Sequence, residues 1–287
     1  MREILADSVP LQTTLKGPVF YAGLGLFTGA QCAIRLVPST VHRGIVFRRV
    51  DLPGKPEVPA RLEFVVQAIR STRLLKGDAS VQTVEHLLSA LQGLGVDNVD
   101  VEVQGPEVPM SDGSAKEFVR MIEEAGIQTL DAPRKIIRIE QPIYWSEGNV
   151  HLIALPAPAS RFSYTLHYPH SPLIRSQYHS CLLNGSLYKA DIAECRTFTL
   201  YEEIAPMIEQ GLLKGGGLEN GLVIQGNLVL NPGGLRFSDE PARHKILDLI
   251  GDLALLGAPI EGHVIAVCSG HASNTAFARE IQKRRGI

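Results

Sequence analysis

The residues best suited to chemistry lie on a predicted helix near the C-terminus, within residues 236–253. His244, Asp248 and Asp252 stand four residues apart, which places them on one face of a helix with 3.6 residues per turn. An imidazole and a carboxylate at positions i and i+4 can bind one divalent cation together. Polar residues at this spacing also occur on the solvated face of an ordinary surface helix. This segment alone therefore leaves both interpretations open.

Two other histidines stand in contexts that suit a shared site. Residues 80–95 predict a helix with Ser80 as its N-cap and Gly95 as its stop, and this helix carries Glu85 and His86. His271 lies in a predicted Ser-Gly-His-Ala-Ser-Asn loop that follows a strand at 262–268. Taken singly, each of these histidines is more typical of a structural residue than of a ligand.

Taken together, these residues fit a catalytic zinc site. Such a site uses three protein ligands and keeps a fourth position for water, and His86, His244 and Asp248 would supply two imidazoles and one carboxylate. The metal lowers the pKa of its bound water to about 7. Glu85, beside one ligand, is then placed to act as the general base.

A second group must protonate the leaving group, and His271 could serve. The carboxylate of Asp252, on the same helical stripe as the ligands, could keep that imidazole charged. Thr197 could donate a hydrogen bond to the oxyanion. With an ionised base and a protonated acid, activity should depend on pH in a bell-shaped way.

Composition narrows the class of protein. The chain has 287 residues, 45% of them hydrophobic, and a net charge of -2, so we predict no nucleic-acid partner. The N-terminus lacks a signal-peptide core, and no apolar run of about 18 residues predicts a membrane span. The four cysteines form no CxxC pair, which favours reduced core residues in a cytoplasmic protein. We predict a monomer.

The order of predicted elements indicates an α+β fold of two similar domains. Each half has strands, a helix with a histidine near its start, a Leu-Gly pair and a valine-rich strand. Residues 131–134 read as a linker, which divides the chain into residues 1–130 and 131–287. Because pockets are common between domains, we expect the site to lie where the two halves meet.

Separated blocks of the sequence resemble one known family, the zinc-dependent UDP-3-O-acyl-N-acetylglucosamine deacetylases of bacterial lipid A synthesis. The blocks occur in the family's order over nearly the whole chain and include Thr83-Val84-Glu85-His86-Leu87, Asp112-Gly113-Ser114-Ala115, Arg196-Thr197-Phe198, Gly215-Gly216, Arg243-His244-Lys245, Gly251-Asp252 and Ser269-Gly270-His271-Ala272.

The resemblance implies a small-molecule substrate, a UDP-sugar lipid, and hydrolysis of its N-acetyl group, with release of acetate. It implies that His86, His244 and Asp248 bind zinc, that Glu85 is the general base and that His271 is the acid or electrophilic histidine, backed by Asp252. It further implies that Thr197 polarises the amide carbonyl and that Lys245 contacts the substrate near the metal. Iron(II) is a possible alternative to zinc, because the same nitrogen and oxygen ligands accept both.

The resemblance also implies a fold in which each domain packs a sheet on helices, with the helices sandwiched between the two sheets and one insert in each domain. The inserts would lie near residues 45–75 and, as a βαβ-type unit, near residues 190–225. The second would form an apolar passage for the acyl chain, with Phe198, Leu200, Leu213 and Gly216 as candidate substrate contacts. These apolar residues would also suit an ordinary core.

One departure from the family pattern stands in the glycine-rich turn near the N-terminus. The family usually has Gly-Leu-His-Ser/Thr-Gly, whereas Phe27 follows Leu26 in this chain. Any substrate contact made by that histidine is therefore in doubt, but the metal site is not.

Two other classes of function remain open on the sequence. A non-catalytic nucleotide-sugar or acyl-chain binding module would hold a structural metal, although such sites usually have four protein ligands and no fourth is evident. A lipid enzyme that works without metal, for instance a dehydratase-like one, would keep full activity after chelation.

Overall fold

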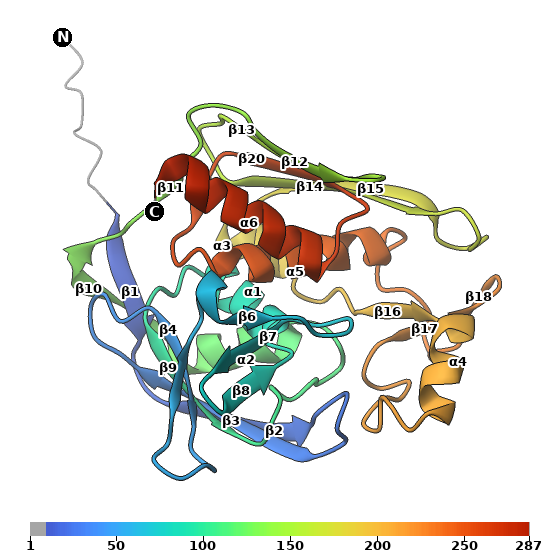
Figure 1. The fold of residues 1–287 in the computed structure, drawn as a ribbon, viewed down its shortest axis with the longest axis horizontal. Coiled ribbons are helices and arrows are strands. Elements are labelled where there is room, and N and C mark those ends of the chain that lie inside the picture. The colour runs from blue at the N-terminus through green and yellow to red at the C-terminus, as the bar shows by residue number, and fades with distance from the viewer. Residues whose placement is uncertain (1–9, 287) are drawn as a thin grey trace.

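Two five-stranded β-sheets form the outer layers of the molecule, and helices fill the space between them (Figure 1). The structure is a computed structural model that describes residues 10–286. The first sheet contains, in spatial order, β2 (Val19–Leu24), β3 (Gln31–Pro38), β9 (Val99–Gln104), β4 (Ile45–Arg49) and β5 (Glu57–Pro59). The second contains β12 (Ile143–Glu147), β13 (Val150–Leu155), β20 (His263–Val267), β14 (Arg161–Tyr168) and β15 (Arg175–Leu182).

The two sheets share one pattern of strand directions. All neighbours pair antiparallel except β4 with β9 and β14 with β20, which pair parallel. In β3, Ile34 and Leu36 are buried while Arg35 between them is exposed, the alternation expected of a strand with one face on a core. The inner faces of both sheets therefore supply the apolar surfaces that the helices cover.

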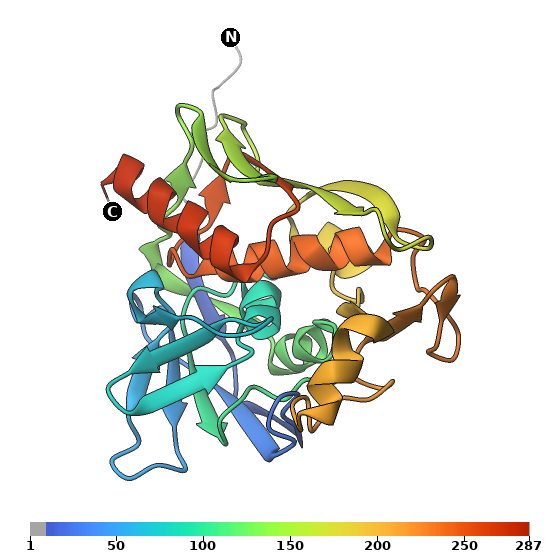
Figure 2. The same ribbon diagram turned by 45° about the vertical axis from the view of Figure 1, so that its right-hand side comes forward.

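Four helices make the central layers. The helices α1 (Glu85–Gly93) and α2 (Lys116–Ala125) lie against the first sheet, and α5 (Glu240–Ala254) and α6 (His271–Arg285) lie against the second (Figures 1 and 2). Helix α1 packs directly on α5 at the centre. The predicted α+β class, with helices sandwiched between two sheets, is confirmed.

Smaller elements extend these layers. They are the pair β1 (Leu11–Leu15) with β10 (Ile127–Pro133), the pair β11 (Ile137–Arg138) with β19 (Ile260–Glu261), the 3-10 helix η1 (Leu62–Phe64), the helix α3 (Gly185–Asp191), and a three-stranded sheet of β6 (Val65–Val66), β7 (Arg73–Lys76) and β8 (Ala79–Gln82). A further strand, β16 (Phe198–Leu200), leads through α4 (Tyr201–Glu209) to its parallel partner β17 (Leu222–Gln225), which β18 (Leu228–Val229) follows. This βαβ unit lies within the region where the sequence placed the second insert. That these units are inserts, and that the domains divide after residue 130, stay predictions.

Several local predictions were wrong. The helix predicted from Ser80 begins only at Glu85, because residues 79–82 form β8 and the chain turns sharply at Thr83. The predicted linker belongs largely to β10, whose residues pair with β1. His271 is the first residue of α6 rather than part of a loop. In the first two cases strand pairing or a sharp turn overrode the local pattern, which short segments cannot reveal. At His271 the helix begins within the predicted loop, with Gly270 as its N-cap.

Candidate active site

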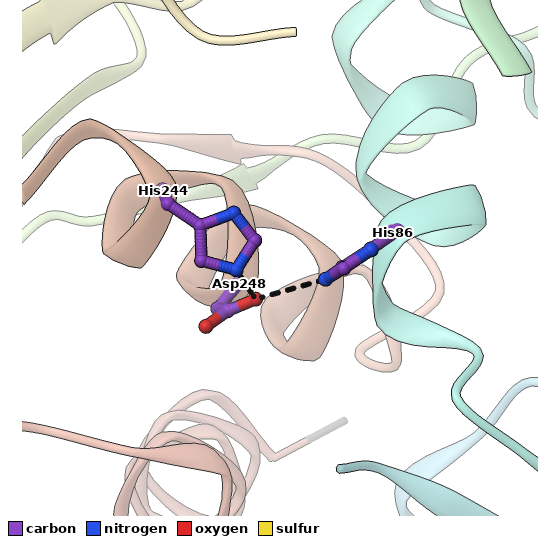
Figure 3. Close-up of side chains that lie close together, drawn as sticks. All are labelled: His86, His244 and Asp248. Atoms are coloured by element: carbon purple, nitrogen blue, oxygen red, sulfur yellow. Dashed lines mark ion pairs between the residues drawn. The ribbon is translucent and has the colours of Figure 1, made fainter. Parts of the chain in front are cut away.

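Three side chains from two helices converge at the centre of the molecule. His86 projects from α1, and His244 and Asp248 project from α5 (Figure 3). The Nε2 atoms of His86 and His244 lie 3.5 Å and 3.2 Å from Oδ1 of Asp248. One ligand atom from each residue lies within 4.8 Å of the other two, and all three residues are buried. This spacing suits three ligands of a single cation.

Hydrogen bonds hold the two candidate ligands of α5 in place. Nδ1 of His244 lies 3.0 Å from the carbonyl oxygen of Cys195. The ring donates there, which leaves the Nε2 lone pair free to bind a metal. Lys245 donates to Oδ2 of Asp248 at 2.7 Å, whereas the buried Oδ1 accepts no hydrogen bond from residues 10–286. A buried acceptor without a donor, between two imidazole nitrogens, fits a bound cation.

Charge also suits these residues to a metal. Although burial disfavours its charge, His244 and Lys245 hold the pKa of Asp248 well below its usual value. Burial lowers the pKa of His244, because it disfavours the imidazolium more than Asp248 favours it. A carboxylate and a neutral imidazole are the forms that bind metal ions.

Glu85 lies beside this cluster at the first position of α1. Its side chain is buried, and burial raises its pKa to about 7, with a partial opposing effect from His271. The backbone N–H of Thr72 donates to Oε2 at 3.0 Å, while Oε1 lies 3.8 Å from Nε2 of His271. A carboxylate with a pKa near neutrality can accept and release a proton under ordinary conditions.

His271 lies next to Glu85. Its Nδ1 lies 2.9 Å from Oδ2 of Asp252. Burial alone would lower the pKa of His271, but Asp252 and then Glu85 raise it to about 10. Asp252 is itself fully buried and accepts hydrogen bonds from Thr72 Oγ1 at 2.5 Å and from Asn274 at 2.8 Å. His271 is therefore held as an imidazolium, with Nε2 directed toward Glu85.

A cavity of about 850 Å³ opens onto these groups. Its lining includes Glu85, His86, Lys245, Asp248 and His271. It also includes apolar residues of the βαβ unit, among them Phe198, Ile204, Ile208 and Leu213. One cavity therefore contains both the buried polar cluster and apolar side chains.

The predicted substrate contacts fall into two groups. Thr197, Phe198, Leu213 and Gly216 line the cavity, and the Lys245 ammonium lies 5.7 Å from the centre of the Phe198 ring. Leu200 is not among the lining residues and packs instead against the hydrophobic core.

Comparison with known proteins agrees with this geometry. The family described as UDP-3-O-acyl N-acetylglycosamine deacetylase, LpxC, matches residues 12–283. The chain belongs to the LpxC family. It is 46% identical over 270 residues to a protein of Chlamydia caviae and 44% identical over 271 residues to one of Chlamydia pneumoniae. Each alignment covers 94% of this chain and 96% of the relative, and both relatives are named UDP-3-O-acyl-N-acetylglucosamine deacetylase.

In this member of the LpxC family, close packing of α1 on α5 brings Glu85 and His86 next to the site residues of α5. A Cβ at Gly251 would lie only 2.1 Å from the carbonyl oxygen of Glu85. Any larger residue would force the helices apart. Arg196 supports the other end of α5, since its guanidinium binds the fully buried carboxylate of Glu240 at 2.9 Å.

The turn that departs from the LpxC pattern lies at the cavity. Phe27 lines the cavity, and the backbone N–H groups of Phe27 and Thr28 donate to the buried carboxylate of Glu107 at 3.1 and 2.7 Å. The backbone of this turn is thus anchored independently of the side chain at position 27.

Sequence reasoning missed three supporting groups: Thr72, Asn274 and the carbonyl of Cys195. Thr72 contacts both Glu85 and Asp252, from 13 and 180 positions away in the chain. No spacing rule relates residues so far apart, so only the fold identifies it. Asn274 stands three residues after His271 on one helix face, and that spacing could have indicated a shared partner.

Proposed function

We propose that this protein removes the N-acetyl group of UDP-3-O-acyl-N-acetylglucosamine by metal-assisted hydrolysis, releasing acetate, as a step of lipid A biosynthesis. One observation carries the chemical part of the proposal. Three ligand atoms lie within 4.8 Å of one another, and the Glu85–His271 pair stands beside them on the wall of the same cavity. The proposed substrate is the one in the names of the two chlamydial relatives.

His86, His244 and Asp248 would hold the metal, which we propose to be zinc. Iron(II) would suit the same donor set. A metal with an open position lowers the pKa of a water molecule and polarises a carbonyl group. The remaining chemistry comes from side chains of this chain.

Glu85 accepts the proton of the attacking water, and its pKa of about 7 suits that exchange. His271 donates a proton to the nitrogen that leaves as the amine. Asp252 keeps this imidazole charged until the C–N bond breaks. The separation of 3.8 Å between Nε2 of His271 and Oε1 of Glu85 means that acid and base lie side by side, where both could reach one amide group.

Thr197 would donate a hydrogen bond to the carbonyl oxygen as negative charge develops there. Lys245 would contact the substrate next to the metal and bring a second positive charge to that oxygen. Phe198, Leu213 and Gly216 would lie along the acyl chain, as the apolar side chains of the cavity suggest. Leu200 is left out of this arrangement, because it does not line the cavity.

Metal analysis combined with a deacetylation assay tests the proposal. Wild-type protein should contain about one metal per chain and release acetate, and His244→Ala should lose both properties. Glu85→Gln should keep the metal and lose turnover. The matched control is His151→Gln, on the β12–β13 hairpin, where the imidazole hydrogen-bonds to exposed Tyr144 and does not line the cavity.

Two results would favour the other classes of function. A metal-loaded wild type without turnover on this substrate would support a binding module. Full activity after chelation, together with an active His244→Ala, would support an enzyme that needs no metal.

A further inference from the structure

Thr83 combines a strained backbone with a position on the cavity wall. Its φ angle is 60°, in the left-handed region that β-branched residues rarely adopt. Among residues 10–286, it is the only β-branched residue in that region. It lies between the end of β8 and the start of α1, two residues before Glu85 and three before His86.

The backbone on both sides of Thr83 is fixed by neighbours. Gln82 donates to the carbonyl of Pro106 at 3.0 Å and accepts from the N–H of Val108 at 3.0 Å, and the N–H of Val84 donates to the carbonyl of Thr72 at 3.4 Å. The strained conformation is therefore imposed by the surrounding structure. It presents Thr83 to the cavity, where the residue is one of the lining groups.

The hydroxyl of Thr83 is exceptional among the buried threonines of residues 10–286. The hydroxyls of the other three, Thr14, Thr72 and Thr275, all donate to an oxygen atom of the protein. Oγ1 of Thr83 is buried in a residue only 2% exposed and contacts no protein hydrogen-bonding group in that range. An unpaired buried hydroxyl destabilises the folded protein, so this position carries two unfavourable features at once.

A second buried oxygen atom of the site also lacks a hydrogen bond within residues 10–286, and a proposed ligand accounts for it. Oδ1 of Asp248 also lacks a hydrogen-bond donor, and there the proposed cation is the partner. A neutral hydroxyl is a poor metal ligand beside two imidazoles and a carboxylate. It is well suited to a hydroxyl or amide group, with which it can act as donor or acceptor.

We propose that Thr83 contacts the substrate directly, through a hydrogen bond from its hydroxyl to a polar group of the amino-sugar ring beside the acetamido group. The position favours the sugar ring, because Thr83 stands two residues before Glu85, which we propose acts on the amide, and lines the same cavity. The hydrocarbon part of the acyl chain has no group that could pair with this hydroxyl. This inference rests on the proposed deacetylase function and adds a residue that determines binding and specificity.

Thr83→Val tests the inference, because valine keeps the size and branching of threonine and removes the hydroxyl. The measurements are kcat and KM for deacetylation, metal content and thermal unfolding. We expect kcat/KM to fall about tenfold, as for the loss of one neutral hydrogen bond. Metal content should be unchanged, and the unfolding temperature should be equal or higher, because an unpaired buried hydroxyl is removed. Thr83→Ser should recover most of the lost kcat/KM.

A structural role for Thr83 predicts a different pattern, in which Thr83→Val unfolds at lower temperature and loses metal. That pattern, or a kcat/KM within twofold of wild type, would overturn the inference. If Thr83→Val does not fold, Thr83→Ala against Thr83→Ser gives the same comparison. Thr129→Val, in β10 and outside the cavity lining, controls for the substitution itself. Absence of wild-type activity would refute the proposed function, whereas an active wild type matched by Thr83→Val refutes this inference alone.

Discussion

The two halves of the molecule position their reactive residues by different means. Helix α1 has nine residues and presents Glu85 and His86 from its first turn, directly after the strained turn at Thr83. Helix α5 has 15 residues and presents His244, Asp248 and Asp252 along its length. The first set depends mainly on the path of the backbone, whereas the second depends on a network of side-chain hydrogen bonds.

This difference has consequences for substitution. In the first half, Nδ1 of His86 is buried without a hydrogen-bond partner in the described structure, and Glu85 is held by a backbone N–H. In the second half, His244 and Asp248 each have a hydrogen-bond partner, and Asp252 has three. Substitutions in the first half should therefore reduce activity either by removing a reacting group or by shifting the backbone. Substitutions in the second half should reduce activity in smaller steps, as each removes one supporting hydrogen bond.

The largest expected effect is that of Glu85→Gln. Glutamine keeps the size of the side chain and its contact with the N–H of Thr72, but it cannot accept the proton of water. Turnover should fall by about 10²–10⁴-fold, the usual contribution of a general base. Elemental analysis should show that the metal is retained. Turnover within threefold of wild type would remove Glu85 from its proposed role.

A smaller effect is expected when the contact between the two halves is disturbed. In Gly251→Ala the new methyl group would meet the backbone of Glu85 at 2.1 Å, and backbone atoms cannot rotate away. The free energy of unfolding should fall by about 3 kcal/mol, at the upper end for overpacking, with weaker metal binding. Denaturant unfolding measures this. The control is Gly17→Ala, where an added Cβ meets nothing within 4 Å; equal stability of the two variants would contradict the close helix packing.

The next effect concerns one supporting residue of the second half. Asp252→Asn removes the negative charge that raises the pKa of His271. The pKa of that imidazole should fall, so that the protonated acid is lost at lower pH. The basic limb of the pH–activity profile should therefore move to lower pH, and activity at neutral pH should fall by about 10–100-fold. A profile of kcat/KM against pH checks this, and an unmoved basic limb would show that Asp252 does not control His271.

The smallest effect is expected for Thr72→Val. This change removes the hydrogen bond from Oγ1 to Asp252 but keeps the backbone N–H that binds Glu85. The loss should be near 1 kcal/mol, or about fivefold in kcat/KM, with a small shift of the basic limb in the same direction as for Asp252→Asn. The double variant Thr72→Val/Asp252→Asn should lose little more kcat/KM than Asp252→Asn alone, because both residues belong to one hydrogen-bond network. Fully additive losses would contradict a shared network.

Much of the site was accessible from the sequence because its residues lie on helices at regular spacing. The i and i+4 relation of His244 and Asp248 predicted their common face, and the block that carries Glu85 and His86 identified the partner helix. The supporting groups were not accessible. Thr72 reaches Asp252 across 180 positions, and the unusual backbone of Thr83 replaces the helical turn that its sequence context favours. Both depend on how strands pair in the small sheet β6–β7–β8, which local sequence does not specify.

The packing of α1 on α5 has a consequence for measurement. Glu85 and His86 come from one side of this contact, and the other proposed catalytic groups come from the other side. Neither half holds a complete set, so under the proposed mechanism acetate release counts only molecules in which both halves are docked. Enzyme assays during refolding would therefore report the docking of the two halves, and two fragments divided between the halves would regain activity only by complementation.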